Sequence, residues 1–83
     1  LLAVCDLTGS HVLEVGCGDG KFTRQYAHLP RKVVGIDPVI SDLQLAVQEP
    51  ALSSSRVRFV QTMGENLPFP RHTFDITIFA CSL

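Results

Sequence analysis

Several features are missing from this 83-residue sequence, and their absence excludes some classes of protein before any motif is considered. It has no basic run, and its net charge is −1, so the electrostatic footprint of a nucleic-acid-binding domain is absent from this segment. No apolar run approaches the roughly 20 residues of a membrane-spanning helix, and no secretory leader is recognisable. The balance of 46% hydrophobic and 18% charged residues is that of an ordinary globular domain.

Cysteine is scarce as well. The three cysteines, Cys5, Cys17 and Cys81, are odd in number and widely spaced, which argues against a disulfide framework and against a metal cluster. We expect each to be a small buried apolar residue. The sequence therefore predicts no metal site and an intracellular, cytoplasmic setting.

The stretch from residue 11 to residue 20 organises the rest of the chain. An apolar, β-branched run ends there in glycines at alternate positions, Gly16, Gly18 and Gly20, which is typical of a buried strand that turns sharply into a loop. Apolar residues spaced by four and then three predict a helix over residues 21–29. This order places free backbone N–H groups and the positive end of a helix at the carboxyl edge of a strand, where the negative part of a ligand can bind.

The spacing of the glycines argues against two other loop types. A phosphate-binding loop needs glycine where Val15 stands and Ser or Thr where Phe22 stands. The dinucleotide fingerprint, starting at Gly16, needs a small residue where Lys21 stands. What remains is Glu-x-Gly-x-Gly-x-Gly, with the carboxylate of Glu14 at the end of the strand.

The rest of the chain alternates strands and helices. A strand over 32–37 ends in Asp37, nineteen residues after Gly18, and an acidic residue at that place can accept hydrogen bonds from ribose hydroxyls. Ser41 and Asp42 are expected to cap a helix that runs to Gln48. Its inner side would carry Leu43, Ala46 and Val47. There follow a loop over 50–55, a third strand over 57–62 and an extended loop between prolines. The fourth strand, over 73–80, is apolar and is therefore expected to be central.

Three segments carry a resemblance to a known family. Residues 14–20 resemble motif I of the class I S-adenosylmethionine-dependent methyltransferases, usually Glu-Val-Gly-Cys-Gly-Thr-Gly, and differ only at Asp19. The segment from Asp37-Pro38 to Ala46 resembles the acidic-loop motif of that family, although Val39 and Ile40 depart from it. Residues 65–69, followed by Phe74-Asp75, resemble the small-molecule, quinone-methylase-like branch. The resemblance spans residues 10–81.

The resemblance implies a fold and a site. The fold would be α/β, a Rossmann-like parallel sheet with flanking helices, in the spatial order third, second, first, fourth strand. Residues 1–83 would form a single partial domain, an incomplete portion of a larger methyltransferase domain that binds S-adenosylmethionine for transfer to a small-molecule acceptor. Glu14 would orient the methionyl ammonium, and Asp37 would bind the ribose. The cofactor-binding residues implied are Glu14, Gly16, Cys17, Gly18, Asp37, Pro38, Met63, Gly64, Glu65 and Ala80.

Several alternatives stay open from the sequence alone. A nucleotide- or NAD-binding Rossmann domain and a non-catalytic methyltransferase-like module are the rival functions. Glu14 and Asp37 could instead be solvated carboxylates at strand ends, Val39 and Ile40 could face the adenine or the core, and Met63 stands where the family often has an adenine-binding aspartate. No catalytic base is evident, since the three histidines are expected on the surface.

Overall fold

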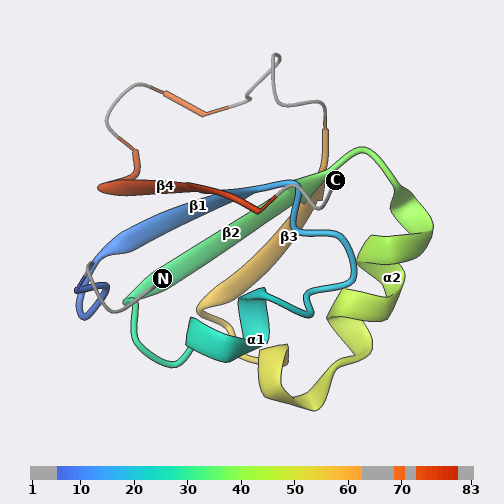
Figure 1. Ribbon diagram of the computed structural model, residues 1–83, viewed down its shortest axis with the longest axis horizontal. Helices are drawn as coiled ribbons and strands as arrows, with labels where there is room; N and C mark the ends of the chain where they lie inside the picture. Colours follow the sequence, from blue (N-terminus) through green and yellow to red (C-terminus); the bar gives the residue numbers. More distant parts are fainter. Residues whose placement is uncertain (1–5, 63–68, 71–72, 81–83) are drawn as a thin grey trace.

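A four-stranded parallel sheet with its helices on one face forms the body of the computed structural model, which describes residues 6–62, 69–70 and 73–80 (Figure 1). In chain order the elements are β1 (His11–Val15), α1 (Thr23–Tyr26), β2 (Lys32–Asp37), α2 (Ile40–Gln48), the 3-10 helix η2 (Pro50–Leu52), β3 (Val57–Gln61) and β4 (Ile76–Phe79). Among these described helices none is long and apolar enough to cross a membrane.

The strand order is β3-β2-β1-β4, with every pair parallel, as predicted. Val15 is in register with Ile36 of β2 and with Phe79 of β4. The carboxyl ends of these strands therefore meet at one edge of the sheet. The chain runs from β1 toward β3 on one side and returns to β4 on the other, so this edge holds the switch point at which open α/β sheets bind ligands.

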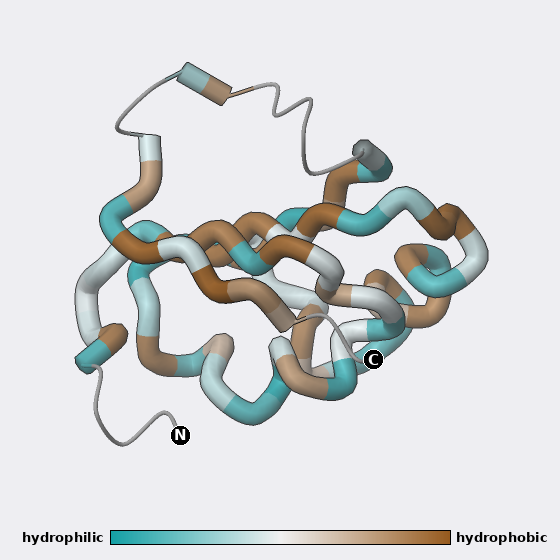
Figure 2. Tube along the Cα trace, turned by 45° about the horizontal axis from the view of Figure 1, so that its top comes forward, coloured by the Kyte–Doolittle hydropathy of each residue, from teal (hydrophilic) through white to brown (hydrophobic). Residues whose placement is uncertain are grey.

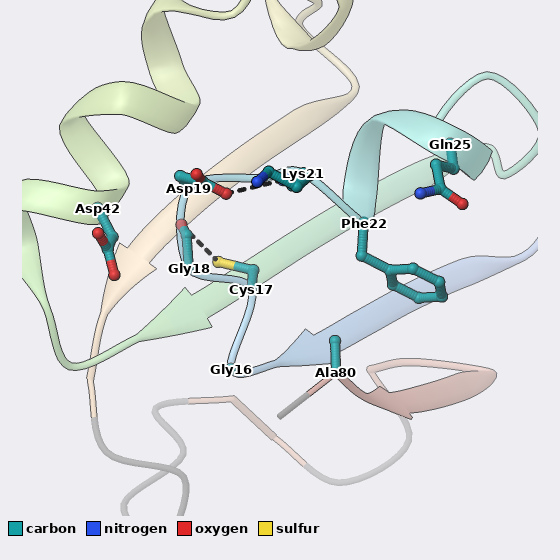
Figure 3. A pocket seen from close by; sticks show the side chains of 9 residues that line it. All are labelled: Gly16, Cys17, Gly18, Asp19, Lys21, Phe22, Gln25, Asp42 and Ala80. Atoms are coloured by element: carbon teal, nitrogen blue, oxygen red, sulfur yellow. Dashed lines mark hydrogen bonds between the residues drawn. The ribbon is translucent and has the colours of Figure 1, made fainter. Parts of the chain in front are cut away.

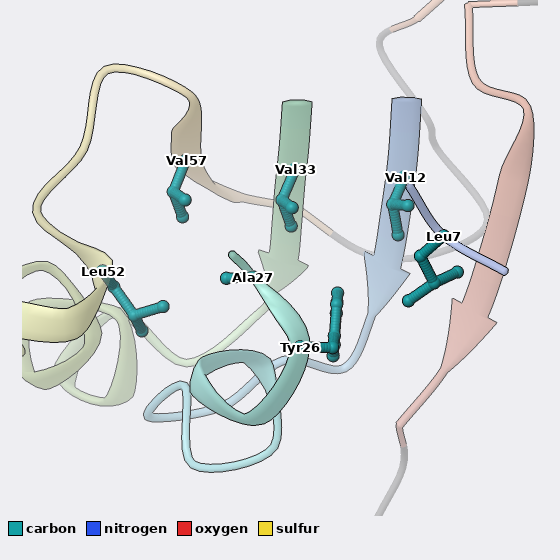
Figure 4. Close-up of a cluster of buried hydrophobic side chains, with 7 residues drawn as sticks. All are labelled: Leu7, Val12, Tyr26, Ala27, Val33, Leu52 and Val57. Atoms are coloured by element: carbon teal, nitrogen blue, oxygen red, sulfur yellow. The ribbon is translucent and has the colours of Figure 1, made fainter. Parts of the chain in front are cut away.

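The principal core lies between the sheet and the helices. It gathers buried side chains from the segment before β1, from three strands, from α1 and from η2, namely Leu7, Val12, Tyr26, Ala27, Val33, Leu52 and Val57 (Figure 4). Burying one such aliphatic or aromatic side chain stabilises a fold by roughly 1.5–3 kcal/mol. Figure 2 shows apolar colour running along the strands, as expected for parallel strands that are buried on both faces.

The opposite face of the sheet carries a second, smaller cluster. Leu13, Val34 and Ile36 form it, and Phe69 and Phe74 pack against it. The rings of Phe69 and Phe74 meet edge to face, with centroids 5.1 Å apart, a favoured aromatic geometry. Phe69 therefore packs as an ordinary apolar residue against this cluster.

The helix expected over residues 21–29 is much shorter than predicted. Only Thr23–Tyr26 is helical, because bonds to the third preceding residue replace helical bonds on both sides: Gln25 N–H donates to Phe22 O, and Leu29 N–H donates to Tyr26 O. The apolar spacing still predicted that Tyr26 is buried, whereas Leu29 is exposed.

The start of α2 also differs from the prediction. The helix begins at Ile40 after Val39, without a side-chain cap, so Ser41 and Asp42 lie inside its first turn. Leu43 and Ala46 are buried as expected, but Val47 is exposed. The expected loop at 50–55 begins with η2, because Pro50 starts this turn and Glu49 accepts the N–H of Ala51.

β4 lies at the edge of the four-stranded described sheet, in agreement with the expected strand order, and the central position predicted from its apolar composition stays a prediction for the larger domain. β4 pairs with β1, its residues alternate between half-buried and exposed, and Phe79 is 74% exposed. An apolar composition predicts burial on both faces but does not identify the neighbouring strand. Asp6 and Leu7, the first described residues, are not helical.

Candidate functional site

Two of the three glycines in the loop that follows β1, Gly18 and Gly20, have different roles. At Gly18, where φ is +55°, an added Cβ would meet nothing within 4 Å, so the space beside this residue is open to a ligand. At Gly20, where φ is +82°, an added Cβ would lie 2.6 Å from Leu52 Cδ1 and 3.3 Å from Ala46 Cβ. Gly20 therefore lets the loop pack against α2 and η2, whereas Gly18 leaves room at the strand edge.

The backbone N–H groups of this loop are largely used within the chain, which corrects the expectation that they are free. Both Gly16 and Cys17 donate to the carbonyl oxygen of Ile36, at 2.8 and 3.1 Å. The N–H groups of Gly18, Gly20 and Lys21 donate to Asp37, Cys17 and Asp19. With a helix of one turn behind it, the loop offers neither the N–H cradle nor the strong dipole of a phosphate-binding loop.

Asp37 joins the glycine loop to the end of β2. Its Oδ2 accepts the N–H of Gly18 at 2.9 Å, its Oδ1 accepts the N–H of Val39 at 2.9 Å, and the residue is buried. This carboxylate is thus not a solvated strand-end group. A carboxylate offers about four acceptor sites, so it retains acceptor capacity for hydroxyl donors of a ligand.

Glu14 is also buried, and it lies under α1. Its Oε1 accepts hydrogen bonds from Thr23 Oγ1, at 2.8 Å, and from the Tyr26 hydroxyl. Its Oε2 is buried and has no hydrogen-bond partner among the described residues. Burial raises the pKa of the Glu14 carboxyl, and the hydrogen bonds from Tyr26 and Thr23 oppose that rise.

A hollow of about 470 Å³ opens beside the loop, at the carboxyl edge of the sheet (Figure 3). Its volume is within the range of about 300–1,000 Å³ that is usual for small-molecule sites. Asp42 faces it from α2, Phe22 and Gln25 from the start of α1, and Ala80 from the end of β4. Its lining is Gly16, Cys17, Gly18, Asp19, Lys21, Phe22, Gln25, Asp42 and Ala80.

The predicted site residues separate into three groups. Gly16, Cys17, Gly18 and Ala80 line the hollow. Glu14, Asp37 and Pro38 lie behind or beside it and are not part of its lining. Met63, Gly64 and Glu65 lie outside the described residues. Val39 and Ile40 are about half exposed, so they do not pack in the core.

Five lining residues were not predicted from the sequence, namely Asp19, Lys21, Phe22, Gln25 and Asp42. Phe22 and Gln25 are three apart, the spacing that places two side chains on one face of a helical turn, and this signal could have found them. Asp42 was interpreted only as a capping residue. Its position in the first turn after the acidic end of β2 could have directed attention to the hollow.

Cys17 is a neutral thiol at the floor of the loop. Its side chain is buried, and its Sγ lies 3.8 Å from the Gly18 carbonyl oxygen. Burial, and then the charges of Glu14 and Asp37, raise its pKa to about 12. The thiolate needed for nucleophilic chemistry is therefore suppressed, in agreement with the expectation of a small buried residue. Cys5 and Cys81 lie outside the described residues.

Gly35 makes the close approach of loop and sheet possible. A Cβ at this position would lie 2.9 Å from Cys17 Sγ and 3.0 Å from Phe59 Cδ1. The Cys17 side chain thus rests directly on the backbone of β2.

Comparison with known proteins decides between the interpretations of this edge. The family model described as a methyltransferase domain matches residues 12–83. The chain belongs to this family. The recognition made from motif I, Asp37 and the 65–75 segment is confirmed, and so is the Rossmann-like fold.

Similar proteins agree with this assignment. A ubiquinone biosynthesis O-methyltransferase of Rhizobium rhizogenes is 32% identical over 72 residues, covering 87% of this chain and 29% of that protein. A Listeria monocytogenes structure assigned as an S-adenosylmethionine-dependent methyltransferase is 27% identical, with a TM-score of 0.79, covering 89% of this chain and 33% of that one. The chain thus spans about three-tenths of the curated methyltransferase it matches.

One similar solved structure is that of an enzyme with a different activity. It is the [4+2]-cyclase SpnF, 31% identical, with a TM-score of 0.73, covering 89% of this chain and 28% of that one. A methyltransferase-like fold can therefore host another reaction, and the activity must be argued from the site.

Proposed function

We propose that the protein is an S-adenosylmethionine-dependent methyltransferase and that residues 1–83 are a single partial domain that binds the methyl donor. The acceptor is a small molecule, and the methylated atom is a hydroxyl oxygen, as the name of the Rhizobium relative indicates for that protein. The cytoplasmic location suggested by the cysteine count stays a prediction.

The observation that carries the proposal is the link between Gly18 and Asp37 at the rim of the hollow. The same carboxylate that anchors the glycine loop lies at the end of β2, where ribose hydroxyls can reach it. A Cβ at Gly18 would fill open space beside the hollow, so the residues present fit an adenosyl ligand. They fit a dinucleotide less well, because five N–H groups between residues 16 and 21 donate within the chain.

The chain's own residues have separate roles in this proposal. Asp37 accepts from the ribose hydroxyls, and Pro38 supports the turn beside it. Gly16, Cys17 and Gly18 bring the loop backbone close to the donor, and Ala80 offers its carbonyl oxygen near the ammonium group. The adenine is lined by Met63, Gly64 and Glu65. Glu14 orients the ammonium group, directly or through water.

The bound donor supplies an electrophilic methyl group, and the protein's task is to align it. Holding two reactants in line can contribute roughly 7–11 kcal/mol to a displacement reaction. The pKa of about 12 argues against Cys17 as a general base, and neither His11 nor His28, the histidines in the part of the chain that the structure describes, lines the hollow. A base that accepts the hydroxyl proton is expected from the remainder of the methyltransferase domain.

Calorimetric titration of the full-length protein tests the class of ligand. S-adenosylhomocysteine should bind with a dissociation constant in the micromolar range or below, about −8 kcal/mol, and NAD should give no comparable heat. Tight binding of NAD without a response to S-adenosylhomocysteine would contradict the proposal. Transfer of a labelled methyl group from S-adenosylmethionine to hydroxylated aromatic acceptors then tests the reaction. Binding without transfer to any acceptor favours the non-methylating alternative.

A further inference from the structure

The hydrogen bonding of Glu14 is one-sided. Two hydroxyl groups, from Thr23 and Tyr26, both donate to Oε1, while Oε2 is buried without a partner among the described residues. A carboxylate that served only to hold α1 on β1 would be expected to have both oxygens satisfied, because an unpaired buried acceptor is costly. The unpaired Oε2 indicates that another group completes this arrangement.

We propose that Thr23 and Tyr26 are positioning residues of the cofactor site, whose hydroxyls orient the Glu14 carboxylate so that Oε2 can receive the ammonium group of the methyl donor, directly or through a water. This inference rests on the proposed function. It assigns the two hydroxyl groups, which the motif resemblance does not include, a role in recognising the amino-acid part of the donor.

The surroundings of Glu14 explain why two donors are needed. Tyr26 and Thr23 contact it from α1, and their hydrogen bonds favour the charged carboxylate. Cys17 of the loop and Asp37 of β2 are the neighbouring titratable groups on the other elements, and Asp42 faces them from α2. Burial raises the pKa of the Glu14 carboxyl, and the hydrogen bonds from the two hydroxyls oppose that rise by favouring the charged form.

Position also connects Glu14 to the hollow. Glu14 lies only two residues before Gly16 and three before Cys17, and both of these residues line the hollow. The helical turn that supplies Thr23 and Tyr26 also supplies Phe22 and Gln25 to the lining. The Phe22 and Tyr26 rings lie 5.5 Å apart, so one short segment holds both the lining and the hydroxyl donors.

The experiment compares two ligands on hydroxyl-deletion variants of the full-length protein. S-adenosylhomocysteine carries the ammonium group, whereas methylthioadenosine keeps the adenosine and lacks the amino-acid part. Tyr26→Phe and Thr23→Val each remove one hydroxyl with little change in shape. Thr23→Ser is the matched control, because it keeps the hydroxyl. Titrations at a series of pH values between about 5 and 7.5 stay below the range in which an α-amino group titrates.

We expect Tyr26→Phe and Thr23→Val to weaken S-adenosylhomocysteine about tenfold or more near pH 6, since a bond to a charged group is involved. Methylthioadenosine affinity should be unchanged, and Thr23→Ser should bind both ligands as the parent does. Each deletion should also move the midpoint of the pH dependence of S-adenosylhomocysteine binding upward, because the carboxylate loses a stabilising donor.

Equal weakening of both ligands would show that the hydroxyls only support the fold, and this outcome overturns the proposal. Unchanged binding of S-adenosylhomocysteine overturns it as well. If Tyr26→Phe does not fold, the Thr23→Val and Thr23→Ser pair decides alone. A parent protein that binds neither ligand contradicts the proposed function itself, so the two failures are distinguishable.

Discussion

The N–H of Gly18 donates to Oδ2 of Asp37 over 2.9 Å, although the two residues are nineteen positions apart in the sequence. This bond fastens the glycine loop to the end of β2, and Val39 shares the same carboxylate. Because Asp37 is buried and has these structural partners, its replacement affects both the ligand and the loop.

Replacing Asp37 with alanine should weaken S-adenosylhomocysteine by roughly ten- to several-hundred-fold, since hydrogen bonds to a charged acceptor contribute about 1.5–3 kcal/mol each and about 1.4 kcal/mol is tenfold. The unliganded melting temperature should also fall, because two backbone N–H groups lose their acceptor. Asp37→Asn, the matched control, keeps one acceptor oxygen and should lose less in both respects. Titration calorimetry beside thermal melting measures the two effects; parent-like affinity in Asp37→Ala would remove the ribose assignment.

Alanine variants of three glycines can be compared, because each glycine has a positive φ and its replacement therefore carries a similar conformational cost. Gly9, Gly18 and Gly20 all have positive φ, at +75°, +55° and +82°, so alanine costs about 1–2 kcal/mol in conformation at each. Gly9→Ala, in open space near the amino end of β1, should show that cost alone. Gly18→Ala should add a large loss of ligand affinity, and Gly20→Ala should add overpacking of about 1–3 kcal/mol against Leu52.

Melting curves and titrations of these three variants should therefore give three different patterns. If Gly18→Ala binds S-adenosylhomocysteine as well as Gly9→Ala does, the open space beside Gly18 is not part of the ligand site. If Gly20→Ala has the same melting temperature as Gly9→Ala, the contact with Leu52 does not limit stability.

Stability without ligand should depend on pH through Glu14. Burial raises the pKa of this carboxyl in the folded protein above the usual 4.5, so the folded state binds the proton more tightly than the unfolded state. The contribution of Glu14 to stability is fully present below about pH 4.5 and is lost as pH rises from there through the folded-state pKa. Glu14→Gln should remove this part of the dependence. Chemical unfolding of both proteins between pH 4 and pH 8 gives the comparison, and parallel pH curves would show that Glu14 does not titrate in this range.

The 83 residues expressed alone should be marginally stable or prone to aggregation. Phe79 is 74% exposed on β4, the edge strand of the described sheet, and exposed apolar edges favour association between chains. Size-exclusion chromatography with thermal melting should show association and a weak transition. A cooperative, monomeric transition would show that this segment is a complete folding unit.

The strand order was predicted from the resemblance to the methyltransferase family, whereas the place of Asp37 was predicted from the glycine spacing and the strand ends, which are local signals. The short length of α1 was not predicted. The spacing of Phe22 and Tyr26 is the same whether the backbone N–H groups of the flanking turns bond to the third or to the fourth preceding residue. The exposure of Phe79 on β4 was not predicted, because an apolar composition does not identify which strand or helix covers a residue. Glu14 was placed correctly at the strand end, but its bonds to Thr23 and Tyr26 depend on how the chain folds back over β1.

The contact between Gly20 and Leu52 has a consequence for the kinetics of ligand entry. With η2 and α2 pressed against the loop and five loop N–H groups already bonded, the loop takes its shape during folding and not on the arrival of a ligand. A preorganised loop spends little binding free energy on ordering. Association should therefore proceed in a single concentration-dependent phase, with no slower conformational step attributable to this loop.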